Sequence, residues 1–308
     1  MHAADNPFLP QARLATRVLR VVAAEAALAL KGGTAINLFF RDAPRLSVDL
    51  DLVYLPLQAR ADALRGIAQA LQRVAKATEA RLPGARVNAS NASRGKLVVQ
   101  ELGVQVKVEV NTVLRGSVLP AGLRPASRAA VSLFNDLEAR TLALEEVYAG
   151  KLVAALDRQH PRDLFDVMLL LDAEGLPPAM LDAFVVYLAS HDRPIAEVLD
   201  PAEKDVAAIY AAEFADMPAE PVPLQALLDA RRRMVQALHR GLEKRHCAFL
   251  LSLKRCEPDW SMLPMPHLAE MPGLRWKLLN LEKLMQEQPA RHAAAVANLE
   301  RTLDRIGQ

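Results

Sequence analysis

The sequence predicts an α+β protein in which a small mixed β-sheet flanked by helices is followed by a mostly α-helical C-terminal part. Three observations favour this class. Short stretches of alternating apolar and polar residues, the pattern of strands, are confined to the first 115 residues. Segments with the apolar spacing of helices flank these stretches, and almost every segment after about residue 138 has that spacing. We expect the boundary within 116–137 and predict domains at 1–125 and 126–308.

The N-terminal elements are predicted in order along the chain. A helix over 9–30 ends at a glycine pair, because glycine stops helices well, and a short helix covers 34–41. A turn with the sequence DAPR precedes a strand at 46–54, and a helix rich in Ala, Leu and Arg follows at about 58–80. The segments RVNASN, KLVVQ and VQVKVEVNTV alternate in polarity and are predicted to form a strand meander.

The C-terminal part is predicted to contain helices at 138–158, 162–173, 178–190, 224–254 and 274–305. Residues 231–255, in and directly after the predicted helix at 224–254, carry a basic cluster against one acid, Glu243. Its basic face is either an ordinary solvated surface or a contact for an RNA backbone. His239 and His246 on this helix are interpreted as surface residues. The cluster consists of Arg231, Arg232, Arg233, Arg240, Lys244, Arg245, Lys254 and Arg255.

The composition is that of a folded protein, since 52% of the 308 residues are hydrophobic. The 38 Lys and Arg nearly balance the 36 Asp and Glu, so net charge favours no class of partner. Cys247 and Cys256 lack the spacing of a zinc site or a disulfide framework, which favours a cytoplasmic location. No apolar run reaches the ~18 residues of a membrane-spanning helix, so we expect no membrane partner.

The strand at 46–54 carries two carboxylates on one face. Successive strand side chains point to opposite faces, so Asp49 and Asp51 are expected side by side with Ser47. Adjacent carboxylates repel each other, and a divalent cation is the expected compensation. The alternative is a solvent-exposed strand face, which commonly carries acids. The other face is apolar, with Leu46, Val48, Leu50 and Leu52.

Glu109 has the same kind of position in the strand VQVKVEVNTV. If the two strands are neighbours, Glu109 joins Asp49 and Asp51 in a site for one or two Mg²⁺ ions. Two ions about 3.5–4 Å apart would activate an attacking hydroxyl and stabilise a leaving phosphate. Alternatively, Lys107 and Glu109 are alternating charges on an exposed strand.

The glycine pair suits an anion. Gly32 and Gly33 lack a Cβ, so their backbone N–H groups can approach a triphosphate closely. A helix beginning near Thr34 would direct its positive end to the same anion, and the Thr34 hydroxyl could add a hydrogen bond. The alternative is a simple helix cap. Together with the carboxylates, these are the parts of a nucleotidyl-transfer site.

Three motifs in order resemble those of the AbiEii/AbiGii toxin family, DNA polymerase β-like nucleotidyltransferases that include the MenT toxins of mycobacteria. KGGTAINLF followed by RLSVDLDL is similar to the first motif, KVEV at 107–110 to the second, and KLVAALDRQHPRDLFDVMLL at 151–170 to the third. The fifteen residues between Gly33 and Asp49 exceed the usual spacing, so we expect a longer turn there. The resemblance implies a nucleotidyltransferase-like domain followed by a helical domain that contributes the third motif to the active site.

The resemblance also implies residue roles. Asp49 and Asp51 would bind metal, whereas Gly33 and Thr34 would hold phosphate and Ser47 would assist at the nucleotide. Lys151 would face the triphosphate, and Asp163 and Asp166 would be an essential acidic pair. For this pair the residues alone leave a structural role at a helix start equally open. The predicted catalytic residues are Asp49, Asp51, Glu109, Lys151, Asp163 and Asp166, and the predicted nucleotide ligands are Gly32, Gly33, Thr34, Ser47 and Lys151.

By the same resemblance, the protein is expected to transfer NMP from an NTP to an RNA, with the 3′ end of tRNA as the favoured acceptor and Mg²⁺ as cofactor. It would be the toxin of a toxin–antitoxin or phage-defence system, with a cognate antitoxin encoded nearby. Two alternatives stay open. The protein is a nucleotide-binding interaction protein without catalysis, or a nucleotidyltransferase that modifies a protein hydroxyl.

Overall fold

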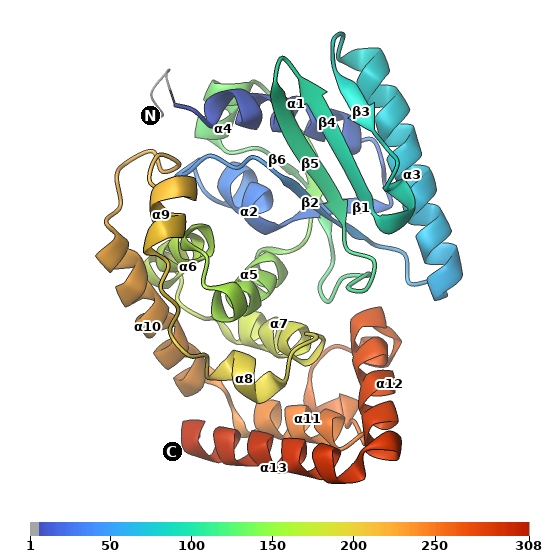
Figure 1. Ribbon diagram of the computed structural model, residues 1–308, viewed down its shortest axis with the longest axis vertical. Helices are drawn as coiled ribbons and strands as arrows, with labels where there is room; N and C mark the ends of the chain where they lie inside the picture. The colour runs from blue at the N-terminus through green and yellow to red at the C-terminus, as the bar shows by residue number, and fades with distance from the viewer. Residues whose placement is uncertain (1–5, 308) are drawn as a thin grey trace. The chain divides into compact units, whose positions relative to one another are not determined.

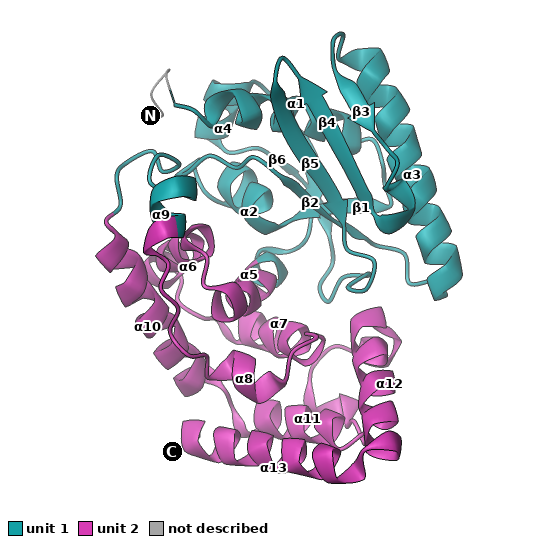
Figure 2. Cartoon of the chain, in the orientation of Figure 1, with its two compact units in different colours: residues 1–147, 209–222 teal, residues 148–208, 223–308 magenta. Residues whose placement is uncertain are grey.

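The computed structural model describes residues 6–307 and confirms the α+β class (Figure 1). The chain forms two compact units (Figure 2). Unit 1 contains residues 1–147 and 209–222, and unit 2 contains residues 148–208 and 223–308. This division differs from the predicted one at 125/126, because the strand at 138–141 pairs within the sheet of unit 1 and a later segment returns to it.

Unit 1 is built on one mixed sheet of seven strands in the order β3-β4-β5-β2-β1-β7-β6. The pairs β1–β7 and β2–β5 are parallel, and the other pairs are antiparallel. The strands are β1 (Leu28–Lys31), β2 (Leu50–Tyr54), β3 (Arg86–Asn88), β4 (Lys96–Glu101), β5 (Val104–Val110), β6 (Gly122–Pro125) and β7 (Glu138–Thr141).

Two long helices, α1 (Leu9–Val22) and α3 (Arg60–Arg81), pack against this sheet. The shorter elements of unit 1 are the helix α2 (Gly32–Ala35), the π-helical η1 (Ile36–Phe40), the 3₁₀ turn η2 (Ala92–Arg94) and the helix α4 (Arg128–Phe134). The helix α5 (Leu144–Arg158) begins in unit 1 and continues into unit 2.

The alternation predicted for 46–54 is present, although only Leu50–Tyr54 is a regular strand. Side chains from 46 to 52 are buried and partly exposed in turn. Leu50 and Leu52 are fully buried, whereas the two aspartates of this stretch are partly exposed. The strand therefore directs one apolar face to the core and one carboxylate face away from it.

The predicted helix over 9–30 is wrong beyond Val22, because 28–31 is the strand β1. A short Leu-Ala-Leu run fits the apolar spacing of a helix as well as that of a strand, so its pairing partners in the sheet decide which one forms. Leu30 pairs with Leu52 on one side and with Thr141 on the other, which places β1 in the middle of the sheet. The predicted helix start at 138–141 is wrong for the same reason, since this segment is β7.

Residues 209–222, the strap, bring the chain back from unit 2 to unit 1. The backbone N–H of Leu46 donates to the carbonyl oxygen of Met217 at 3.0 Å, and the N–H of Ala219 donates to that of Pro44 at 2.8 Å. The strap thus fixes the backbone just before the carboxylate strand.

Unit 2 is helical, and two of its predicted helices are each split in two. The predicted helix at 224–254 is interrupted near Glu243, between α10 and α11. The predicted helix at 274–305 is interrupted between α12 and α13, where Pro289 starts a new helix. Its elements after α5 are α6 (Pro161–Ala173), α7 (Pro178–Ala189), α8 (Ile195–Leu199), the start of α9 (Ala207–Glu213), α10 (Leu224–Gly241), α11 (Lys244–Lys254), η3 (Trp260–Met262), η4 (Leu268–Glu270), α12 (Pro272–Glu287) and α13 (Pro289–Ile306).

His246 is fully buried at the break between α10 and α11, which corrects the interpretation of this residue as exposed. Its Nδ1 accepts a hydrogen bond from the backbone N–H of Glu243 at 3.0 Å. The proton therefore sits on Nε2, which lies 2.8 Å from Asp182 Oδ1 and donates to it. His246 is thus a structural cap of α11.

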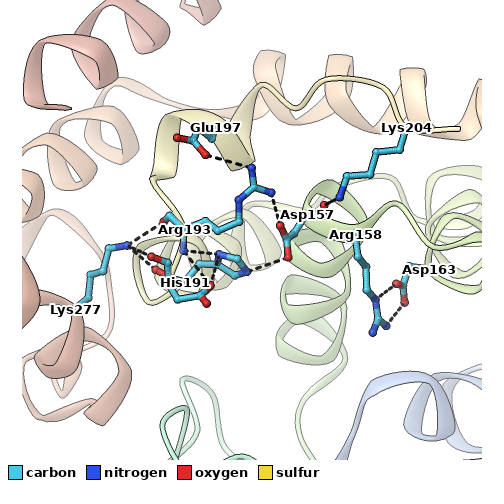
Figure 3. Close-up of polar contacts among 9 residues, drawn as sticks. Asp157, Arg158, Asp163, His191, Arg193, Glu197, Lys204 and Lys277 are labelled. Carbon is cyan, nitrogen blue, oxygen red and sulfur yellow. Dashed lines mark hydrogen bonds and ion pairs between the residues drawn. The ribbon is translucent and has the colours of Figure 1, made fainter. Parts of the chain in front are cut away.

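A buried lysine clamps the connection between α7 and α8 (Figure 3). Lys277 is 6% exposed, and its Nζ donates to the carbonyl oxygens of His191 at 2.6 Å and Arg193 at 2.9 Å. Burial lowers the pKa of the Lys277 ammonium to about 8. Arg193 and His191 both pair with Asp157 of α5, so this network ties three segments of unit 2 together.

None of the helices in the described part of the chain combines the length and the hydropathy needed to cross a bilayer.

Candidate active site

The glycine pair directly follows β1 and forms the first two residues of α2, so it does not lie at the end of a long helix. Gly32 has a φ of +68°, a left-handed conformation that favours glycine. A Cβ on Gly32 would lie 2.7 Å from Asp51 Oδ2, and one on Gly33 would lie 2.6 Å from the Arg45 guanidinium. Gly32 is therefore strained for any other residue, whereas a Cβ at Gly33 would require the Arg45 guanidinium to move.

The hydroxyl of Thr34 is used inside the site. It donates to the backbone carbonyl oxygen of Asp49 at 2.5 Å and lies 2.8 Å from the hydroxyl oxygen of Ser47. Thr34 has one hydroxyl proton, so Ser47 is the donor in their contact. Thr34 is 2% exposed, so in this arrangement it holds Ser47 and Asp49 in place.

We expect Thr34→Val to lower the free energy of unfolding by about 1–3 kcal/mol, because it leaves the part-buried Asp49 carbonyl and Ser47 hydroxyl without their partner. Urea unfolding followed by circular dichroism measures this change. Thr34→Ser is the matched control, since it keeps the hydroxyl. A Thr34→Val protein as stable as Thr34→Ser would contradict the positioning role.

A row of four charged residues crosses the middle of the sheet. Lys31 of β1 is opposite Asp51 of β2, Asp51 is opposite Glu109 of β5, and Glu109 is opposite Lys96 of β4. Directly opposite residues share a face, so the row reads plus, minus, minus, plus on one side of the sheet. The predicted neighbourhood of Asp51 and Glu109 is thus present.

These carboxylates are suitable ligands for Mg²⁺, which prefers oxygen and is commonly held by one or two carboxylates together with substrate phosphates. Gly32 adds to the fit, because its missing Cβ leaves room beside Asp51 Oδ2. Glu109, however, has Lys96 as its partner, with Oε1 2.9 Å from Nζ. Within residues 6–307, no three His, Cys, Asp or Glu side chains are gathered as a ready-made metal site.

The residues of the third motif come together in unit 2. Lys151 Nζ lies 2.6 Å from Asp163 Oδ1 and 3.0 Å from Asp166 Oδ2. Arg158 adds a second cation to Asp163, as Figure 3 shows. Both aspartates are 0% exposed and Lys151 is 6% exposed. They form a buried ion-pair network, which orients the Lys151 ammonium.

The charge of Asp163 is maintained by its partners. Burial by itself would raise the pKa of this carboxyl, because it disfavours the charged form. Lys151 and Arg158 outweigh this effect, and the pKa of Asp163 is well below its usual range. Asp163 is therefore ionised at neutral pH, as its contact with Lys151 requires.

The basic cluster of residues 231–255 is largely neutralised within unit 2. Five of its eight members are paired with carboxylates, and Lys254 is buried. These pairs weaken the interpretation of this segment as an RNA contact, because their charge is already compensated. They are Arg231–Glu203, Arg232–Asp229, Arg233–Asp172, Arg245 with Asp182 and Glu243, and Arg255–Glu300.

The sequence-based selection of site residues omits Arg45 and Lys96. Arg45 is 3% exposed with its guanidinium beside Gly33, and it lies two residues before Ser47 in the quoted segment RLSVDLDL. Lys96 is the first residue of β4, and its pairing follows from the hairpin turn at Leu102 and Gly103.

Comparisons with known proteins identify the family of the chain. A family model described as the nucleotidyl transferase AbiEii toxin of a type IV toxin–antitoxin system matches residues 13–278. A search of curated proteins gave no match. Among solved structures, the chain is similar to MenT4, a nucleotidyltransferase toxin from Mycobacterium tuberculosis. The TM-score is 0.63 at 18% identity, over 91% of this chain and 95% of that one.

The family match, together with the similar fold, shows that the chain is a nucleotidyltransferase enzyme. The chain belongs to the AbiEii nucleotidyltransferase toxin family, whose model covers most of its length. The resemblance inferred from the three sequence motifs is thus confirmed.

Proposed function

We propose that the protein transfers NMP from an NTP to a hydroxyl of an RNA, with the 3′ end of tRNA as the favoured acceptor and Mg²⁺ as cofactor. The observation that supports this best is the cross-strand pair of Asp51 and Glu109 beside the Gly32–Gly33 turn. It combines carboxylates for a divalent cation with a close backbone approach for phosphate. The RNA acceptor is proposed from the family resemblance.

In the proposed mechanism, the chain contributes position and charge. Asp49 and Asp51 are the proposed metal ligands, and Mg²⁺ held there would polarise the phosphates and activate the acceptor hydroxyl. The backbone of Gly33 is proposed to orient the triphosphate, and the Ser47 hydroxyl is proposed to assist once it turns from Thr34 to donate to a phosphate oxygen. The acceptor hydroxyl releases its proton to solvent as its oxygen attacks the α-phosphorus, the bond to the bridging oxygen breaks, and pyrophosphate leaves in line.

Lys151 is proposed as a triphosphate ligand from its place in the third motif. Asp163 and Asp166 are then positioning residues, since they hold its ammonium at 2.6 Å and 3.0 Å. An ammonium carries three N–H donors, so one donor remains after these two contacts for a phosphate oxygen.

The family model supports a role as the toxin of a toxin–antitoxin system, and we propose that a cognate antitoxin is encoded nearby. Blocking translation by modification of tRNA is the proposed effect, and phage defence is a proposed context for it. We propose a cytoplasmic location, where an NTP and an RNA acceptor are both available.

Incubation with each α-³²P-labelled NTP, Mg²⁺, total RNA and total protein tests this function. We expect label in a species that ribonuclease destroys and protease does not, and no label when EDTA replaces Mg²⁺. Label that only protease removes would favour modification of a protein hydroxyl. NTP binding without any transfer would favour a non-catalytic interaction protein.

A further inference from the structure

We propose that Lys96 is a displaceable counter-ion of Glu109, which holds this carboxylate in the absence of metal and must be released before Glu109 can bind a divalent cation. This inference rests on the metal site of the proposed function. Lys96 is then a positioning residue, because its ion pair sets the metal concentration at which the Glu109 carboxylate joins the metal site.

The geometry of the charge row carries the proposal. Glu109 lies between Asp51 on one neighbouring strand and Lys96 on the other, in register with both. Its Oε1 is 2.9 Å from Lys96 Nζ. Repulsion from Asp51 and attraction to Lys96 act in the same direction, so Glu109 pairs with the lysine when no cation offsets the two carboxylates.

The backbone fixes Lys96 opposite Glu109. Gly95 precedes Lys96 with a φ of +79°, and a Cβ on it would lie 2.4 Å from the carbonyl oxygen of Val110. The N–H of Val110 donates to the carbonyl oxygen of Gly95 at 2.7 Å. The start of β4 is thus held tightly against the end of β5. The Lys96 ammonium can leave Glu109 by rotation of its side chain, without movement of the backbone.

The strength of the ion pair suits a displaceable contact. The side chains of Lys96 and Glu109 are 57% and 40% exposed. Exposed pairs of this kind shift an equilibrium by only about 1.5- to 5-fold. A divalent cation can therefore displace Lys96 from Glu109, and this competition weakens the apparent affinity for the cation by about 1.5- to 5-fold.

Titration with Mn²⁺ in the absence of NTP, with free Mn²⁺ measured by electron paramagnetic resonance, tests the proposal. We expect Lys96→Met to tighten Mn²⁺ binding by about 1.5- to 5-fold. Lys107→Met is the matched control, since it removes the same charge from the same face two residues before Glu109. We expect Glu109→Gln to weaken binding, and Lys96→Met to lose its effect in that background.

Three outcomes would overturn the proposal. Mn²⁺ affinity equal in Lys96→Met and wild type would show that the ion pair does not compete with metal. Equal gains in Lys96→Met and Lys107→Met would reduce the effect to general electrostatics. Equal affinities in wild type and Glu109→Gln would show that Glu109 does not reach the metal. Because no measurement here involves transfer, an absence of transfer in the labelling assay would count against the proposed function and not against Lys96.

Discussion

Asp49→Ala is expected to reduce nucleotide transfer by at least about 10³-fold, because loss of a metal ligand removes several kcal/mol of charge stabilisation from the transition state. The fold is expected to survive. Asp49 is partly exposed, and its removal relieves repulsion with Asp51. Initial rates with the labelled NTP that wild type uses measure the first effect, and the thermal unfolding midpoint measures the second.

Asp62→Asn is the control for this change. Asp62 lies on α3 in the same unit, and its side chain is 54% exposed. Its replacement removes one carboxylate that is not part of the charge row. We expect wild-type transfer from this variant. Transfer by Asp49→Ala at more than a tenth of the wild-type rate would contradict the assignment of Asp49 as a metal ligand.

The second large effect concerns stability. Asp163→Asn is expected to lower the free energy of unfolding by about 3–5 kcal/mol, because it leaves the buried Lys151 with one carboxylate partner in place of two. Asp172→Asn on the same helix is the matched control. Its carboxylate is 53% exposed in a surface pair with Arg233, and such pairs contribute about 0–1 kcal/mol. Similar losses in the two variants would contradict a buried network.

The dependence on pH provides an independent readout. The folded-state pKa of Asp163 is lowered, so the stability it contributes is fully present above its ordinary value of 3.8 and is lost as pH falls below that value. Denaturant unfolding between pH 2 and pH 7 is therefore expected to show a flatter acid limb for Asp163→Asn than for wild type. Acid limbs of equal slope in the two proteins would show that ionisation of Asp163 does not contribute to the pH dependence of stability.

The sequence was most informative where a local pattern had one interpretation. Alternation from Leu46 to Leu52 predicts a two-faced strand, and the same alternation in β5 predicts the face of Glu109. The run at 28–31 was mispredicted because four residues do not distinguish a strand from a helix. Its pairing with β2 and β7 decides, and both partners lie far away in the sequence.

The residues of the candidate site are visible as a local pattern in the sequence, whereas their partners are not. The local sequence indicates that Asp51 and Glu109 are polar-face residues, yet only the strand order shows that they are adjacent. Lys96 is an intermediate case. The two-residue turn of Leu102 and Gly103, both with positive φ, fixes the hairpin register that brings residue 96 opposite residue 109.

The strap has a consequence for how the protein is made. A nascent chain that ends at residue 150 contains every strand of the sheet, but it lacks the contacts of Met217 and Ala219 with Leu46 and Pro44. The backbone leading to the carboxylates gains these contacts only after the ribosome has added about two thirds of the chain. The backbone that leads into the proposed metal ligands Asp49 and Asp51 therefore reaches its final hydrogen bonding only late in synthesis.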